Sequence, residues 1–111
     1  MGGADLVEVR VSAPDEETAR ALASALVDSR LVACAQVLGP ITSTYWWQGQ
    51  VETAQEYLLL AKTTADRFEA IRERVASEHP YDNPEILAVP VASAAPLYAA
   101  WLRESLGSGD D

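Results

Sequence analysis

The densest chemistry in this sequence lies between His79 and Ile86, a segment that reads HPYDNPEI. It offers an imidazole, a phenol, two carboxylates and an amide, groups that bind metals or polar ligands. Pro80 and Pro84 each fix φ at about −65° and push the preceding residue toward an extended backbone. Because so stiff a connector holds its side chains in few positions, it is a candidate binding loop. The alternative is a proline-rich stop that ends one helix and directs the next strand.

Other polar residues are candidates to line a binding cleft together with this loop. Cys34 is the only cysteine, and we expect it to be a small buried core residue, as free cysteines usually are. Lys62 is a surface charge, a partner for an anionic ligand, or a partner for Glu85. Glu56 and Asp82 add carboxylates. One histidine and one cysteine do not supply a nucleophile, a base and an orienting group, so the sequence does not predict an enzyme.

Length and composition limit the classes of protein to consider. The 111 residues suffice for one domain, with an ordered core expected at about residues 5–106. The net charge of −9 repels phosphate backbones and argues against nucleic acid as a partner. No apolar run is long enough to span a membrane, so we expect no membrane partner. A single cysteine cannot form an internal disulfide, which fits a reducing compartment, and the cytoplasm is the expected location.

Strand-like and helix-like periods alternate along the chain. Residues 6–11 alternate apolar and charged side chains, as in a half-buried strand. After Pro14 and three acidic residues, apolar residues recur at helical spacing up to Val27. The elements expected after these are a strand from Leu31 to Trp47 bent at Gly39-Pro40, a hairpin tip at Gln48-Gly49, a strand from Val51 to Thr63, a helix capped by Thr64, a strand from Ile86 to Val91, and a helix from Pro96 ended by Gly107.

This order, β-α-β-β-α-β with an added C-terminal helix, predicts an α+β protein with a ferredoxin-like antiparallel sheet. The usual strand order, 4-1-3-2, puts the second and fourth strands at the edges. Pro40 and Pro90 agree with that order, because proline cannot donate to a central ladder. The RNA-recognition domains that share this order need stacking aromatics on the central strands, which are absent here. The second strand would be a long edge bearing Tyr45, Trp46 and Trp47, and so bare an edge invites aggregation.

The simplest way to cover that edge is another copy of the chain, so the three aromatics are predicted to lie in a homo-oligomer interface. A set of motifs in sequence order then points to one family. The motifs are Ala13-Pro14-Asp15-Glu16, Arg30-Leu31-Val32-Ala33-Cys34-Ala35, Ser43-Thr44-Tyr45-Trp46-Trp47-Gln48-Gly49, Lys62-Thr63-Thr64, His79-Pro80-Tyr81 and Pro84-Glu85-Ile86, with Tyr98 and Trp101 on the last helix. Together they closely resemble the CutA divalent-cation tolerance proteins over roughly residues 5–106.

The resemblance implies a cytoplasmic homotrimer linked to tolerance of copper and other divalent metals. In the family that this chain resembles, the members credited with copper ligation have a cysteine and a second histidine. This chain has Val11 and Glu78 at those two positions. The candidate metal ligands that remain are His79, Glu78 and Glu85; alternatively, the ring of His79 holds the connector by hydrogen bonds to backbone. One imidazole with carboxylates is a weak copper site, because soft-metal selectivity usually needs thiolates or several imidazoles. We therefore expect at most a weakly bound Cu²⁺, and no cofactor essential for folding.

Two functions remain open. The first is a metal-tolerance protein that binds divalent cations weakly at intersubunit clefts. The second is a trimeric small-molecule sensor similar in architecture to PII-like signalling proteins, with an anion in those clefts held by Lys62 and Arg30. The candidate cleft residues are Cys34, Glu56, Lys62, Tyr81 and Asp82.

Overall fold

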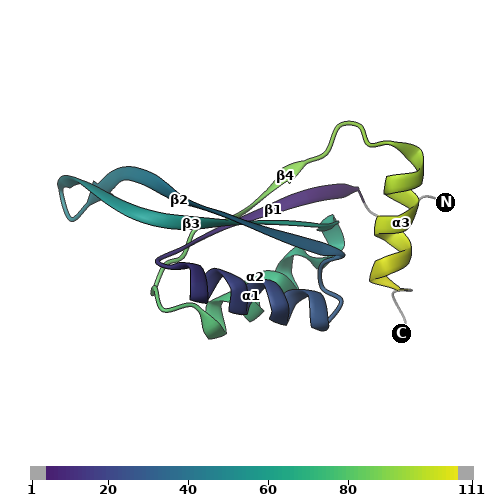
Figure 1. Ribbon diagram of the computed structural model, residues 1–111, viewed down its shortest axis with the longest axis horizontal. Coiled ribbons are helices and arrows are strands. Elements are labelled where there is room, and N and C mark those ends of the chain that lie inside the picture. Colours follow the sequence, from purple (N-terminus) through teal and green to yellow (C-terminus); the bar gives the residue numbers. More distant parts are fainter. Residues whose placement is uncertain (1–4, 108–111) are drawn as a thin grey trace.

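The computed structural model describes residues 5–107, which form a four-stranded antiparallel sheet with two helices on one face and a third helix at one end (Figure 1). Residues 1–4 and 108–111 lie outside the described part of the chain. The elements in chain order are β1 (Leu6–Ala13), α1 (Glu16–Asp28), β2 (Cys34–Trp47), β3 (Gln50–Thr64), the single 3-10 turn η1 (Ala65–Arg67), α2 (Phe68–Glu78), β4 (Ile86–Pro90) and α3 (Pro96–Leu106).

The strand order β2-β3-β1-β4 confirms the predicted ferredoxin-like arrangement. All three strand pairs are antiparallel, and β2 and β4 are the edges. Pro40 and Pro90 therefore both lie on edge strands, where a missing N–H costs no ladder hydrogen bond. None of the helices in residues 5–107 is long and apolar enough to cross a membrane.

The core lies between the sheet and the helices α1 and α2. Alternate residues of β1 face it, because side chains along a strand point to opposite faces in turn. Helix α1 contributes residues at helical spacing to the same layer. The buried members are Val7, Val9, Val11, Leu22, Leu26, Val32, Leu59, Ala61, Ile71 and Val75. A smaller cluster of Leu6, Leu102 and Leu106 attaches α3 to the end of β1.

Asp15 is the N-cap of α1, and its carboxylate accepts a hydrogen bond from the Thr18 N–H at 2.7 Å. The start of the next helix differs from the prediction. Thr64 makes no side-chain cap: it ends β3, the turn η1 intervenes, and α2 begins only at Phe68. The Thr64 hydroxyl instead accepts a hydrogen bond from Arg67 at 3.0 Å.

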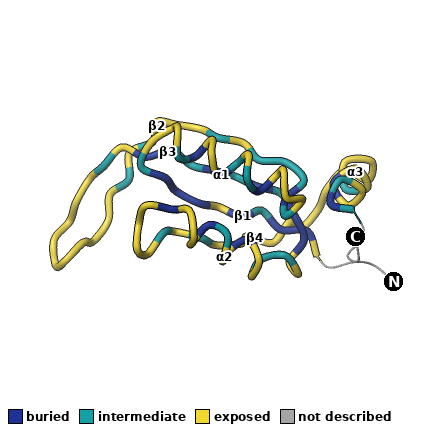
Figure 2. Tube along the Cα trace, turned by 90° about the horizontal axis from the view of Figure 1, so that it is seen from below, coloured by how far each residue is buried: buried dark blue, intermediate teal, exposed yellow. Residues whose placement is uncertain are grey.

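The β2–β3 hairpin reaches well beyond the helical layer, and most of its outer part is exposed (Figures 1 and 2). Its tip is the predicted Gln48-Gly49 turn, and both residues have positive φ, 50° and 82°, as a tight hairpin turn requires. The predicted bend is also present: the pairing register shifts between Leu38 and Ile41, around Gly39-Pro40. This bulge divides the hairpin into an inner half beside the helices and an outer half beyond them.

Candidate functional site

The connector between α2 and β4 is anchored by His79. The residue is the C-cap of α2, its N–H donates to the Val75 carbonyl, and it is only 8% exposed. Ring atom Nδ1 accepts a hydrogen bond from the Tyr81 N–H at 3.1 Å. Nε2 therefore carries the ring proton and donates it to the Ser12 carbonyl at 2.7 Å. Both ring nitrogens are thus engaged with backbone, the second of the two roles that the sequence left open.

Tyr81 ties the same connector to the base of the hairpin. Its hydroxyl donates to Oε2 of Glu56 at 3.0 Å, and Glu56 is 8% exposed. The rings of Tyr81 and His79 lie 4.9 Å apart between centroids. Burial, followed by the hydrogen bond to the Glu56 carboxylate, raises the pKa of Tyr81 to about 12. Ser12, Glu56, His79 and Tyr81 form one unit, which we call the connector cluster.

The candidate metal ligands do not gather within one chain. Glu78 is paired with Arg74 on the outer surface of α2. Glu85 and Asp82 are exposed on the connector. Among residues 5–107, no group of three histidine, cysteine, aspartate or glutamate side chains is arranged to hold a metal ion. His79 would have to give up a hydrogen bond to bind one, so a single subunit does not fit a resident metal.

Cys34 and Lys62 lie elsewhere, on the sheet face opposite α1 and α2. They are register partners on β2 and β3, and Glu8 of β1 continues the row. Cys34 is half-exposed, with Sγ 3.6 Å from the Tyr98 hydroxyl, so the expectation of a buried core cysteine was wrong. The contact with Cys34, then burial, raises the pKa of Tyr98. Cys34 lies on the uncovered face of the sheet because the residues of opposite parity along β2, Ala35 and Val37, pack against the core.

Lys62 does not pair with Glu85. Its ammonium donates to Oε1 of Gln36 at 2.6 Å and lies 3.6 Å from Glu8. Arg30, the other cation proposed for an anion, donates to the Ser105 carbonyl at 2.6 Å. Both cations are therefore used within the chain. We call Glu8, Cys34, Lys62 and Tyr98 the sheet-face cluster.

The predicted cleft residues thus fall into two separate groups in one subunit. Glu56 belongs to the connector cluster and Lys62 to the sheet-face cluster. The two residues are six positions apart on β3, which corresponds to about 20 Å at the rise of a strand. No small ligand touches both groups of one chain.

The predicted interface aromatics are all exposed on the outer half of β2. Tyr45 is 41%, Trp46 75% and Trp47 56% exposed, and Val51 across the tip is 57% exposed. Exposed tryptophans in this number are unusual for a free surface. The three residues lie where the sequence placed them, on an edge that nothing in residues 5–107 covers.

Two hollows were not predicted from the sequence. A cavity of about 480 Å³ opens where α1 faces the bulge of β2, and its walls include Glu16, Arg20 and Tyr57. The Gly39-Pro40 pair signalled the bulge but not the neighbours that α1 brings to it. A second hollow of about 330 Å³ lies between the first turns of α1 and the end of α2, beside Pro80.

Comparisons with known proteins agree with the fold and extend over nearly the whole chain. Residues 7–105 match the family described as CutA1 divalent ion tolerance protein. The chain is 48% identical over 99 residues to the divalent-cation tolerance protein CutA of Thermus thermophilus, covering 89% of this chain and 96% of that protein. The solved structure of the Thermus thermophilus protein has a TM-score of 0.89 at 47% identity, with 92% and 99% of the two chains covered. CutA from Xylella fastidiosa gives 0.88 at 38% identity, with 93% and 99% covered.

Proposed function

The chain belongs to the CutA1 divalent ion tolerance protein family, and on that premise we propose that it acts as a homotrimer in divalent-cation tolerance. Its metal contact would be weak and would lie at the boundary between subunits. The proposal assigns the chain no reaction of its own. Its location would be the cytoplasm, where the free thiol of Cys34 stays reduced.

The observation that carries the assembly is the open edge of β2. The strand has 14 residues and exposes Tyr45, Trp46 and Trp47, whereas the other edge, β4, has only five residues. Two unlike edges favour a head-to-tail contact between copies, which closes into a ring when the rotation allows. The resemblance to the family supplies the number three. Covering the aromatic edge removes both the unpaired backbone and the exposed tryptophans.

The weakness of the metal contact follows from the donors. Since residues 5–107 of one chain do not gather three donors, the proposed site combines residues of two chains, with His79, Glu78 and Glu85 as this chain's candidates. His79 would first lose its hydrogen bond to Ser12 or to Tyr81. Glu78 would compete with its pairing to Arg74. Each exchange reduces the net free energy of binding.

Light scattering at micromolar concentration tests the assembly and should give about three times the chain mass. A monodisperse monomer would end this proposal. Calorimetric titration with Cu²⁺ tests the metal contact: His79→Ala should weaken binding, while Glu104→Gln, a carboxylate change on α3, should leave it unchanged. Tight binding that survives His79→Ala would move the contact to other carboxylates.

A second candidate, a small-molecule sensor of PII-like architecture, is favoured by a different observation. The chain has an open cavity of about 480 Å³ beside the edge strand, a volume in the range of ligand pockets. A wild-type protein with the trimer mass but no detectable Cu²⁺ binding would favour this candidate. The anion in it would need cations other than Lys62 and Arg30, since both are held within the chain.

A further inference from the structure

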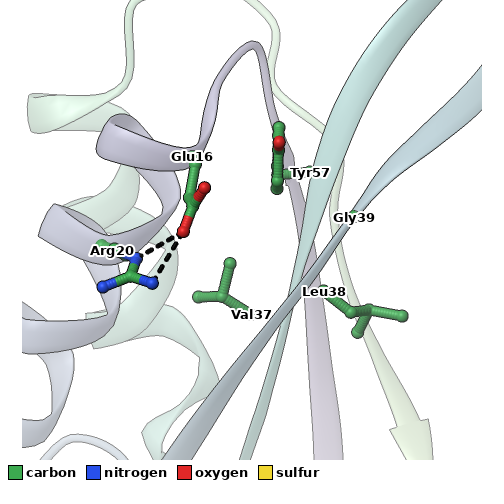
Figure 3. A pocket seen from close by; sticks show the side chains of 6 residues that line it. All are labelled: Glu16, Arg20, Val37, Leu38, Gly39 and Tyr57. Carbon is green, nitrogen blue, oxygen red and sulfur yellow. Dashed lines mark hydrogen bonds and ion pairs between the residues drawn. The ribbon is translucent and has the colours of Figure 1, made fainter.

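The cavity at the bulge of β2 has walls of three kinds (Figure 3). Helix α1 supplies a carboxylate and a guanidinium, β2 supplies aliphatic side chains and bare backbone, and β3 supplies an aromatic ring. The lining residues are Glu16, Arg20, Val37, Leu38, Gly39 and Tyr57. Charged and apolar groups therefore face one volume of about 480 Å³.

The aromatic wall depends on the glycine of the bulge. Gly39 has φ +155°, and a Cβ there would lie 2.6 Å from Cδ2 of Tyr57. Only glycine lets the ring of Tyr57 rest against the backbone of β2. The Tyr57 ring and Val37 both line the cavity, and the side chain of Val37 points toward α1 (Figure 3).

The charged wall is the ion pair between Glu16 and Arg20. Nε and Nη2 of Arg20 contact the same oxygen, Oε2 of Glu16, at 2.8 and 2.7 Å. Both contacts converge on one carboxylate oxygen, so Oε1 of Glu16 and Nη1 of Arg20 lie outside them. Both side chains are well exposed, 73% for Arg20 and 48% for Glu16, so water reaches the pair and their contact is easily exchanged.

We propose that this cavity binds a free α-amino acid with an aliphatic side chain. The carboxylate would accept hydrogen bonds from Arg20, the ammonium would donate to Glu16, and the side chain would lie against Val37 and the ring of Tyr57. Arg20 suits a carboxylate because its planar fork donates two parallel hydrogen bonds. Burial of the ligand's aliphatic side chain against the apolar walls then adds a favourable hydrophobic contribution to binding.

The spacing of the charges selects the α position. Because the groups of Glu16 and Arg20 touch each other, a ligand can satisfy both only if its own two charges are close neighbours. In an α-amino acid they are separated by one carbon atom. A zwitterion with a long chain between its charges can contact either Glu16 or Arg20, but not both. The site therefore discriminates by charge separation rather than by total charge.

The test uses L-leucine and its isomer ε-aminocaproate, which has the same atoms but a distant ammonium group. Amide NMR spectra of the full-length protein are recorded while each probe is added. L-leucine should shift the signals of Val37, Gly39 and Tyr57 saturably in the low millimolar range. Its affinity should exceed that of ε-aminocaproate by about tenfold, the effect of one charged hydrogen bond.

Two variants assign the binding to this cavity. Arg20→Gln should weaken L-leucine binding by about tenfold. Arg72→Gln breaks a matched surface ion pair on α2, with Glu69, and should have no effect. The same spectra report whether each variant is folded.

The proposal is overturned if L-leucine gives no saturable shift, if the two isomers bind equally, or if Arg20→Gln binds as well as the wild type. It is independent of the assembly and the metal contact proposed above. A chain with the trimer mass that ignores L-leucine would disprove only the amino-acid site. A monomer that binds L-leucine through Arg20 would disprove only the assembly.

Discussion

The inner and outer halves of the β2–β3 hairpin both carry apolar side chains, but in opposite surroundings. In the inner half, Leu59 and Ala61 are completely buried. In the outer half, Trp46 is 75% and Val51 57% exposed, although both are as apolar as their inner counterparts. The difference is the helical layer, which covers the sheet only as far as the bulge (Figures 1 and 2). Burial follows from the helical cover, and in the proposed assembly another copy of the chain would cover the outer half.

The boundary between the halves is where the chemistry gathers. The bulge at Gly39-Pro40 ends the regular pairing on β2. Beside it, β3 places Tyr57 toward α1 and Glu56 toward the connector. Bulges bend a strand and redirect its side chains, which is why they recur next to functional sites. In this chain the bulge separates a part that is buried by its own core from a part that the proposed assembly would cover.

The largest expected effect falls on the inner half. Leu59→Ala empties a fully buried position and should lower the free energy of unfolding by about 3 kcal/mol. Urea denaturation measures this loss. The matched control is Leu97→Ala on α3, where the leucine is 86% exposed and the change should be within about 0.5 kcal/mol. Equal losses from both variants would show that helical cover does not decide burial.

The next effect falls on the outer half and depends on protein concentration. Replacing Trp46 and Trp47 together by alanine should weaken assembly, since truncating a buried interface aromatic costs about 2 kcal/mol or more. Sedimentation velocity over a dilution series should show the variant dissociating where the wild type stays assembled. Val27→Ala, a substitution of an exposed apolar residue on α1, is the control. If the double variant keeps its mass and heat stability, the outer half is not an interface.

The sequence predicted these two halves better than the candidate site. The periods along the chain indicated the element order and so the ferredoxin-like plan, and the prolines at 40 and 90 agreed with its usual strand order, because period and missing donors are local properties. The prediction of the site was wrong where the position of a residue depended on how the strands pair. Cys34 faces the open side of the sheet because of its parity along β2, and Lys62 meets Glu8 rather than Glu85 because of the β1–β3 register. A short segment of sequence does not specify which residues pair across neighbouring strands.

The boundary itself can be tested through Gly39. A Cβ at this position would lie 2.6 Å from the Tyr57 ring, so Gly39→Ala should cost about 1.5 kcal/mol by overpacking and by the positive φ. Part of that cost should return in the double variant Gly39→Ala, Tyr57→Ala, because removing the ring removes the clash. Gly49→Ala at the tip has open space around it and strains only the backbone. Additive losses in the double variant would mean that the ring does not constrain the bulge.

The smallest effect concerns the contact between Tyr81 and Glu56, the outermost buried position of β3. Tyr81→Phe should cost about 1 kcal/mol at neutral pH by removing one hydrogen bond. The unfolded chain releases the Tyr81 proton near its ordinary pKa of 10, whereas burial and Glu56 hold the folded pKa at about 12. The contribution of this proton to stability is therefore complete below pH 10 and is lost as pH rises toward 12.

Urea denaturation of wild type and Tyr81→Phe between neutral pH and pH 12 measures that loss. The difference in stability between the two proteins should shrink above pH 10, because only the wild type has this phenol to ionise. Tyrosinate absorbance should show one late-titrating phenol in the wild type that is missing from the variant. A constant difference across this range would mean that Glu56 does not hold the connector through the Tyr81 proton. The connector would then be held to the sheet through the bond of His79 to Ser12 on β1.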